Sequence, residues 1–319
     1  MAPDDRIVRA LMEIAWLEDF TMLAECGHFS RAAERRNITQ PAFSRRVKTL
    51  EEWVGTSLFT RDTHRVELTA AGELFKPIAE EVLRLIYLGR QQAMSAAQSS
   101  AETLHFASTH ALSINFFPDW LRLIEEQTSL ESIVSLIADN MAGCERLILQ
   151  GDVQFLLCHH HPSAATALDP KQFQWLDIGL DMLVPVSVPE SEGSALPRFA
   201  LPGTMENKVS YLSYSATSGM GRIIAAIHRL DAPPAWLSPT FTSHVATVLL
   251  AMTRSGRGLA WLPLSLLEPH LQLGELVRAG GEEWDIPITI RVFRPRVRQS
   301  SAAERFWASL QQMYSPAAG

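Results

Sequence analysis

Four hydrogen-bonding side chains recur along residues 39–54 at a spacing that suits one side of a helix. They lie on or near one face of the helix expected there: Gln40, Ser44, Arg45 and Lys48. The apolar side chains of the segment, among them Phe43 and Val47, fall on another face. Glutamine pairs well with adenine and arginine with guanine, whereas serine and lysine suit phosphate. The pattern therefore predicts a helix that contacts DNA.

The segments around this helix predict the elements that position it. A helix from residue 14 is stopped by Gly27, and a short helix around Ala32 and Ala33 has small residues that permit a close crossing. A tight turn at residues 37–39 leads into the polar helix. Strands are expected at 57–59 and 66–68, so Arg61 and Arg65 would flank the tip of the ribbon. Three helices and a ribbon make a winged helix-turn-helix, whose second helix enters the major groove by its N-terminal end.

Charge is distributed unevenly along the chain. The 319 residues carry a net charge of −7, but residues 28–65 hold eight basic and four acidic side chains. The rest of the chain holds 20 basic and 31 acidic side chains, because the whole has 28 and 35. A small basic module on an acidic body is typical of nucleic-acid binding, although solvated helix faces can give the same counts.

Three stretches of this region resemble the N-terminal domain of LysR-type transcriptional regulators. They are residues 29–34 (FSRAAE), 39–51 (TQPAFSRRVKTLE) and 55–61 (GTSLFTR), followed by the L-T-x-x-G of residues 68–72. The resemblance implies a winged helix-turn-helix, a linker helix that dimerises and a two-lobed effector domain like a periplasmic binding protein. We include Ser30, Arg31 and Pro41 among the expected DNA contacts. The family usually has leucine where this chain has Arg36, which leaves the packing there in question.

This layout divides the chain into residues 1–68, a linker helix and hinge at 69–98, and an effector domain at 99–319. In the linker helix, four apolar residues form a stripe suited to a partner helix: Leu74, Ile78, Val82 and Leu85. An ordinary amphipathic helix packed on its own domain has the same spacing. We expect a homodimer or homotetramer and no membrane span, because no apolar run approaches the ~18 residues that a span needs.

From residue 103 onward, short apolar runs alternate with helical stretches. Strands are expected at 103–108, 131–138, 153–158, 182–188, 209–214, 258–262 and 288–293, and helices at 115–127, 140–150, 218–230, 243–254 and 300–313. Alternation of this kind predicts an α/β fold with an open, largely parallel sheet and helices on both faces. The family resemblance implies two lobes, one of about 103–175 with the C-terminal part from about 275, the other of about 176–274.

Polar side chains cluster where these strands end, and such positions hold ligands in open α/β folds. The candidate effector contacts are Ser108, Thr109, His110, Ser113, Ser215, Thr217, Ser218, Thr242, Ser243, His244 and Trp261. Each cluster could equally be a plain helix N-cap. Three convergent clusters predict a pocket for a small polar effector held mainly by hydroxyls and amides, with Arg222 as the nearby cation.

A finer resemblance, to the hypochlorite-responsive branch of the family, rests on three further stretches. These are residues 215–222 (SATSGMGR), 256–263 (GRGLAWLP) and 303–307 (AERFW). That branch is associated with methionine oxidation, which makes an apolar side chain polar. Met220 matches one such methionine and is the candidate redox switch. Ile124 and Val245 occupy two other such positions, so a switch of several methionines does not carry over.

Other classes of function have weaker support. A solute-binding protein conflicts with the basic N-terminal module and with an N-terminus unlike a secretory signal. An α/β enzyme would need a phosphate loop, a G-x-S-x-G elbow or an H-E-x-x-H motif, none of which the sequence contains. His159, His160 and His161 lack further spaced ligands, so we expect no metal and no cofactor. Three widely spaced cysteines favour a reducing cytoplasm.

Overall fold

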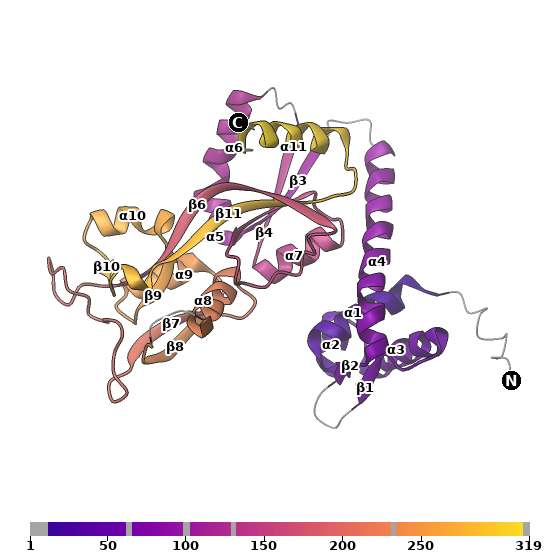
Figure 1. Ribbon diagram of the computed structural model, residues 1–319, viewed down its shortest axis with the longest axis horizontal. Coiled ribbons are helices and arrows are strands. Elements are labelled where there is room, and N and C mark those ends of the chain that lie inside the picture. The colour runs from indigo at the N-terminus through magenta and orange to yellow at the C-terminus, as the bar shows by residue number, and fades with distance from the viewer. Residues whose placement is uncertain (1–11, 62–65, 98–102, 129–131, 231–233, 315–319) are drawn as a thin grey trace. The chain divides into compact units, whose positions relative to one another are not determined.

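The structure is a computed structural model that describes residues 12–61, 66–97, 103–128, 132–230 and 234–314. It divides after Ala93 into two compact units, residues 1–93 and 94–319 (Figure 1). Each unit has a hydrophobic core of its own. Among the described residues, no helix has the length and apolar character to cross a membrane.

The first unit begins with three helices and a two-stranded ribbon. Its elements are α1 (Ile14–Cys26), α2 (Phe29–Arg35), α3 (Gln40–Val54), β1 (Phe59–Arg61) and β2 (Val66–Leu68). Gly27 and Gly55 take left-handed φ angles of 64° and 84° and end α1 and α3 as expected. Phe20, Phe43 and Leu50 are fully buried in a shared core. The helix-turn-helix with a wing is therefore present.

The turn between α2 and α3 depends on small residues and one left-handed residue. Ala32 and Ala33 are buried against the neighbouring helices. Asn37 has a φ of 54°, a conformation that asparagine tolerates better than most residues. The backbone N–H of Ile38 then bonds the Ala33 carbonyl, which closes the turn before α3.

The first strand begins two residues later than expected, at Phe59, and pairs antiparallel with β2. Residues 57 and 58 are used differently: the Leu58 side chain is buried and its carbonyl accepts from Thr69. The Thr69 hydroxyl donates to the Ser57 carbonyl and accepts from the Gly72 N–H. A Cβ on Gly72 would lie 2.2 Å from the Leu58 carbonyl oxygen. The L-T-x-x-G motif thus joins the wing to the next helix.

That next helix is α4 (Ala70–Ala97), and it carries apolar side chains on two sides. Phe75, Ala79 and Leu83 pack on the core of the first unit. Leu74, Ile78 and Leu85 are exposed by 75%, 59% and 48%. The expected hinge at 95–102 lies partly outside the described residues.

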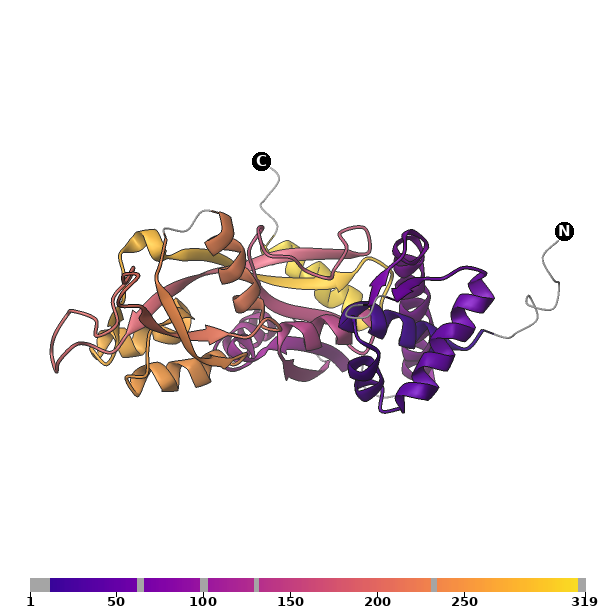
Figure 2. The same cartoon turned by 90° about the horizontal axis from the view of Figure 1, so that it is seen from below.

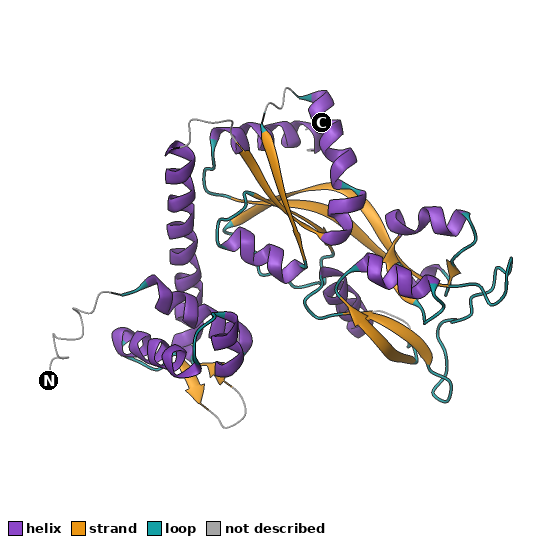
Figure 3. Cartoon of the chain, turned by 180° about the vertical axis from the view of Figure 1, so that it is seen from behind, coloured by secondary structure: helices purple, strands orange, loops and turns teal. Residues whose placement is uncertain are grey.

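The second unit is an α/β structure. Its elements in order are β3 (Thr103–Thr109), α5 (His110–Asn115), α6 (Phe117–Gln127), β4 (Ile133–Asp139), α7 (Met141–Leu149), β5 (Phe155–His160), β6 (Phe173–Ser187), β7 (Val209–Tyr214), α8 (Gly219–Leu230), β8 (Leu237–Ser243), α9 (Ala246–Arg254), β9 (Ala260–Pro263), α10 (Leu264–Gln272), β10 (Val277–Arg278), the 3₁₀ helix Glu282–Trp284, β11 (Ile286–Pro295) and α11 (Ser301–Tyr314). Figure 3 shows helices flanking the strands of this unit.

The prediction of a largely parallel sheet is wrong. The main sheet has the order β10-β6-β11-β5-β3-β4, with β9 also paired to β6. Only the pairs of β3 with β4 and β5 are parallel in it, and β6 and β11 pair antiparallel with each other and with their other neighbours. The physical reason is that β6 and β11 are long strands that run from one lobe into the other in opposite directions (Figures 1 and 2).

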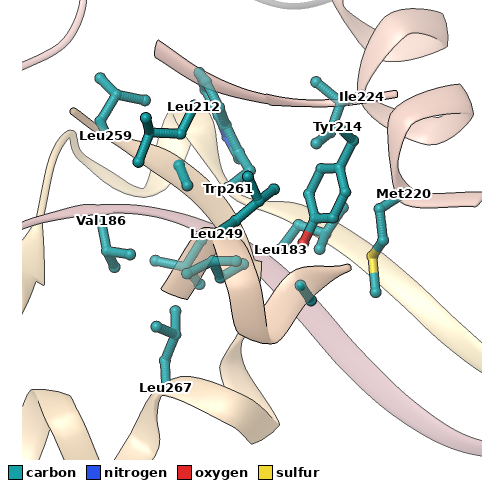
Figure 4. Packing of buried hydrophobic residues seen from close by; sticks show 14 of the residues in the cluster. Leu183, Val186, Leu212, Tyr214, Met220, Ile224, Leu249, Leu259, Trp261 and Leu267 are labelled. Atoms are coloured by element: carbon teal, nitrogen blue, oxygen red, sulfur yellow. The ribbon is translucent and has the colours of Figure 1, made fainter. Parts of the chain in front are cut away.

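Two lobes follow from this arrangement. Lobe I contains β3, β4, β5, α6, α7 and α11, and lobe II contains β7, β8, β9, α8, α9 and α10. Lobe I has a core on each face of the sheet, because successive residues such as Phe106 and Ala107 point to opposite faces. Lobe II has a single large core in which β7 and β8 form a separate parallel pair. Figure 4 shows Trp261 and Leu249 within that core.

Candidate DNA-binding face and interlobe pocket

The outer face of α3 presents the polar side chains that the sequence indicated. Gln40, Pro41, Arg45 and Lys48 are exposed and Ser44 is half-buried, whereas Phe43 and Val47 face the core. Thr39 stands at the N-cap with extended backbone angles, so the first amides of α3 lie at the same end as Gln40 and Pro41. Exposed donors at a helix N-terminus suit phosphate and base edges.

The remaining expected DNA contacts lie on neighbouring elements. Ser30 and Arg31 are exposed in the first turn of α2. Arg61 is the last residue of β1. Arg65 lies outside the described residues, as does the tip of the ribbon.

Arg36, at the end of α2, turns inward rather than to the helix edge. Its Nε donates to Asp19 Oδ1 at 2.8 Å, and its guanidinium also pairs with Glu18. Burial alone would lower the pKa of Arg36, but the bonds from these two carboxylates raise it above its ordinary value. The position that is usually leucine in the family therefore holds an ion pair between α1 and α2.

A small pocket, partly open to solvent, lies between the two lobes of the second unit. Its wall is built from residues at the ends of several strands and the starts of helices: Thr109, His110, Ala111, Asp139, Asn140, Met141, His159, Tyr214, Ser218, Gly219, Met220, His244 and Ala246. Figure 4 shows Met220 beside Tyr214. Among these described lining residues there is no lysine or arginine.

Three buried polar atoms at this pocket have no hydrogen-bond partner within the described part of the chain. They are Thr109 Oγ1, His159 Nδ1 and the Tyr214 hydroxyl. Thr109 occupies the N-cap position of α5, yet its side chain makes no capping bond. Burial raises the pKa of Tyr214, with Tyr211 adding to the effect, so its hydroxyl stays protonated and can donate. An unpartnered buried polar group costs free energy unless a water or a ligand bonds to it.

Other polar groups of the pocket are oriented by their neighbours. The His159 Nε2 lies 3.3 Å from Asp181 Oδ2, and its Nδ1 is buried without a partner among the described residues. Asn140 Oδ1 accepts from the Gly143 N–H and caps α7, while Asp139 accepts from the Asn140 N–H and side-chain amide. The rings of His110 and His244 lie 5.7 Å apart between centroids.

Arg222 does not line this pocket, contrary to our expectation. Its Nη1 donates to both carboxylate oxygens of Glu145, at 3.0 and 2.8 Å. It lines a second small pocket with Cys158, His160, His161 and Thr166. The nearby strong cation is thus held by a carboxylate of lobe I.

Comparisons with known proteins match the chain along nearly its whole length. Residues 14–73 match the bacterial regulatory helix-turn-helix family of LysR type, and residues 97–315 match the LysR substrate binding domain. This chain belongs to the LysR family. The regulator YjiE of Escherichia coli K12 is 28% identical over 302 residues, 95% of each chain.

Solved structures agree with this membership. Full-length HypT of Salmonella typhimurium, described as a hypochlorite-specific LysR-type regulator, is 27% identical, with 95% of this chain and 99% of that chain covered and a TM-score of 0.56. Vibrio fischeri DarR in complex with DNA is 29% identical, with 94% and 99% covered and a TM-score of 0.53. The chain is therefore a LysR-type DNA-binding transcriptional regulator with an effector-binding domain, and its relatives are regulators rather than enzymes.

In this LysR-family regulator, only some of the expected effector contacts meet at the interlobe pocket. Thr109, His110, Ser218 and His244 do, and the candidate redox switch Met220 lies on the same wall. Ser108 is fully buried, and the Ser113 hydroxyl donates to the His110 carbonyl within α5. Trp261 is buried in the lobe II core, where its Nε1 donates to the Trp284 carbonyl at 2.9 Å. We therefore exclude Ser108, Ser113 and Trp261 from the pocket.

The other expected contacts form local hydrogen bonds near strand ends. Ser215 and Thr217 share a hydroxyl pair at 2.9 Å, and Thr242 pairs with Ser213 at 2.8 Å. Ser243 Oγ accepts from the Val245 N–H, which is a local cap. For these four residues the capping or pairing alternative describes the structure, and they do not line the pocket.

The sequence did not lead us to several polar residues that line the pocket, although they also lie at strand ends. Asp139 and Asn140 follow β4, and Tyr214 ends β7. His159 lies near the end of β5, inside the histidine run. The described residues contain no group of three or more metal-binding side chains that could hold an ion. Asp139, Asn140, His159 and Tyr214 could have been predicted from the rule that ligand sites lie at the ends of strands.

Proposed function

We propose that this regulator binds DNA through the outer face of α3 and the wing, and that its interlobe pocket takes a small polar effector without strong negative charge. The DNA contacts would be Ser30, Arg31, Gln40, Pro41, Ser44, Arg45, Lys48, Arg61 and Arg65. The functional division would be residues 1–68, 69–98 and 99–319. A regulator of this kind would work in the cytoplasm.

The observation that carries the effector proposal is the set of unpartnered buried atoms on Thr109, His159 and Tyr214. Tyr214 and Thr109 hydroxyls can donate and accept, and a histidine nitrogen can do either according to its tautomer. With no cation among the described lining residues, a dianion would lack a charge partner. Hydroxyl, amide or amine groups fit this wall better.

A thermal-shift screen of small polar metabolites against the full chain tests this proposal. Deleting one hydrogen bond should lower the affinity for an effector by about fivefold, because one bond contributes ~1 kcal/mol. Thr109→Val and Tyr214→Phe should each reduce the shift, whereas Thr242→Val, whose hydroxyl pairs with Ser213 outside the pocket, should not. Equal thermal shifts in all variants would show that the effector does not bind in this pocket.

A second candidate function is oxidant sensing at Met220, as the neighbour HypT is described. The observation that favours it is the place of Met220, a buried thioether on the wall of the same pocket. A sulfoxide there would place a polar oxygen against apolar neighbours. Mild hypochlorite should change DNA binding by the wild type and not by Met220→Leu. A response retained in that variant would reject this switch.

We also propose that α4 pairs with α4 of a second copy, because its exposed stripe has no cover within the described chain. Leu74, Ile78 and Leu85 are apolar side chains that water solvates poorly. A homodimer built in this way could pair further into a tetramer.

A further inference from the structure

Asp19 is a fully buried carboxylate at the centre of the DNA-binding unit. Its side chain is 0% exposed and lies on α1 between the two helices of the turn. Arg36, just after α2, and Arg46 on α3 both point to it. A buried carboxylate needs such cations, because an unpaired charge in the interior is strongly unfavourable.

The two arginines are held unequally. Arg36 Nε lies 2.8 Å from Asp19 Oδ1, and the same guanidinium also binds Glu18, whose other oxygen accepts from the Tyr87 hydroxyl. Arg46 reaches Asp19 Oδ2 only through Nη1 and only at 3.5 Å. Its side chain is 38% exposed, against 24% for Arg36. Arg36 is therefore the main partner of Asp19, and Arg46 is a loosely held one.

The charges of this cluster balance as it stands. Glu18 and Asp19 are two acids, and Arg36 and Arg46 are two bases. Without Arg36, two carboxylates would remain beside α3 with Arg46 as the only cation bonded to Asp19. Arg46 would then be drawn fully onto Asp19, and the surface next to α3 would become more negative.

We propose that Arg36 is a positioning residue for DNA binding: by satisfying Asp19 and Glu18 it leaves Arg46 available to bind a DNA phosphate. This inference rests on the proposed role of α3 in DNA binding. Arg46 has donors beyond Nη1, and phosphate contacts by arginine fix the register of a protein on the duplex.

The salt dependence of DNA binding tests this proposal in the full chain. The probe is a duplex that the wild-type protein selects from random sequence, bound at several salt concentrations. Each phosphate contact contributes about −0.9 to the slope of log affinity against log salt. Arg46→Gln and Arg36→Leu should each make the slope shallower by about 0.9 and weaken binding by about three- to tenfold at moderate salt.

Two double variants separate positioning from mere stability. The Arg36→Leu, Arg46→Gln double variant should have the same salt slope as Arg46→Gln alone, because both changes remove the same phosphate contact. In Arg36→Leu with Asp19→Asn, the slope should return to the wild-type value, because the neutral amide no longer holds Arg46. Arg36→Gln, a less drastic change, provides a second test if Arg36→Leu unfolds at the temperature used.

An unchanged slope in both folded Arg36 variants would overturn the proposal, and so would slope losses that add in the Arg36→Leu, Arg46→Gln double variant. If the wild type selects no duplex at all, the proposed DNA-binding role itself fails, which is a different result.

Discussion

Arg45 lies on the outer face of α3, one residue after Ser44 and away from the buried core of the first unit. We predict that Arg45→Ala weakens binding to the selected duplex by tenfold or more, since a good arginine contact to a base contributes about 1–3 kcal/mol. Thermal unfolding should not change, because the side chain is exposed. Fluorescence anisotropy of the labelled duplex measures the loss.

Arg122→Ala is the matched control for this change. Arg122 is an exposed arginine on α6 in the second unit, paired with Asp119. The Arg122→Ala change removes the same charge and leaves α3 unaltered, so it should change the affinity for DNA by less than twofold. Equal losses in the two variants would mean that total charge, rather than the α3 face, governs binding.

His160, on β5, predicts a pH dependence of stability. Burial and then the Arg291 guanidinium lower its pKa from 6.5 to about 4, with Asp177 opposing the shift and His161 adding to it. The unfolded chain thus binds a proton at higher pH than the folded chain does. Stability from this residue is present above pH 6.5 and is lost as the pH falls from about 6.5 to about 4.

Replacing His160 with glutamine should make urea stability fall less steeply between pH 6.5 and 4.5. We expect a difference of roughly 1–2 kcal/mol after allowing for the partial exposure of the ring. His28→Gln, at an exposed surface position, is the control and should follow the wild type. If His160→Gln and wild type lose stability in parallel, His160 is not a source of the acid sensitivity.

The residue-scale predictions from sequence succeeded where a residue had one clear environment. Gln40, Arg45 and Lys48 could be placed on the exposed face of α3 because helical spacing separates them from Phe43 and Val47. Trp261 could not be placed, because an aromatic next to a strand end suits a pocket wall and a core equally. Its burial is decided by packing with Leu212 and Trp284, which lie far away in sequence.

At the scale of elements, α4 has an apolar stripe that its own unit does not cover. Val82 packs partly on the core of the first unit, so its replacement would also affect folding. Ile78→Glu with Leu85→Glu changes only strongly exposed positions. We predict that this double variant sediments as a smaller assembly than the wild type, because paired helices would bury the new charges.

Leu180→Glu is the control for that experiment. Leu180, on β6, is also a strongly exposed leucine, but it belongs to the second unit and is not part of α4. Its assembly should match the wild type. A double α4 variant that keeps the wild-type mass would show that another surface holds the oligomer.

Elements with strong periodicity or clear end signals could be predicted, and elements defined by tertiary pairing could not. α1 and α3 end at the glycines that the sequence marked. β6 runs from Phe173 to Ser187, but only residues 182–188 read as a strand, because Asp177, Gly179 and Asp181 interrupt the apolar pattern. β8 contains Pro239 and polar residues, and its strand conformation depends on pairing with β7.

At the scale of the whole molecule, polar contacts join lobe I to lobe II in the second unit. The Ala142 N–H donates to the Thr217 carbonyl at 3.3 Å, and Arg222 of α8 pairs with Glu145 of α7. Glu145 is nearly buried and also accepts from Thr166 and the Ala167 N–H. These contacts tie the starts of α7 and α8 together beside the pocket.

Removal of the cation from this pair should be costly. We predict that Arg222→Met lowers the free energy of unfolding by about 2–4 kcal/mol, because Glu145 is left buried without its countercharge. Urea denaturation of the second unit's transition measures it. Arg222→Met combined with Glu145→Gln should recover part of the lost free energy of unfolding. If nothing is recovered, the loss comes from packing rather than from the unpaired charge.

Specific DNA recognition by the α3 face underlies the proposed function, and selection of duplexes from a random pool by the 319-residue protein tests it. We predict enrichment of one sequence with two inverted half-sites about one helical turn or a multiple of it apart, as expected for a symmetric dimer. Arg45→Ala should abolish or relax the enrichment. If the protein retains all sequences equally, or if wild type and Arg45→Ala enrich the same sequence to the same degree, the α3 face does not recognise the DNA sequence.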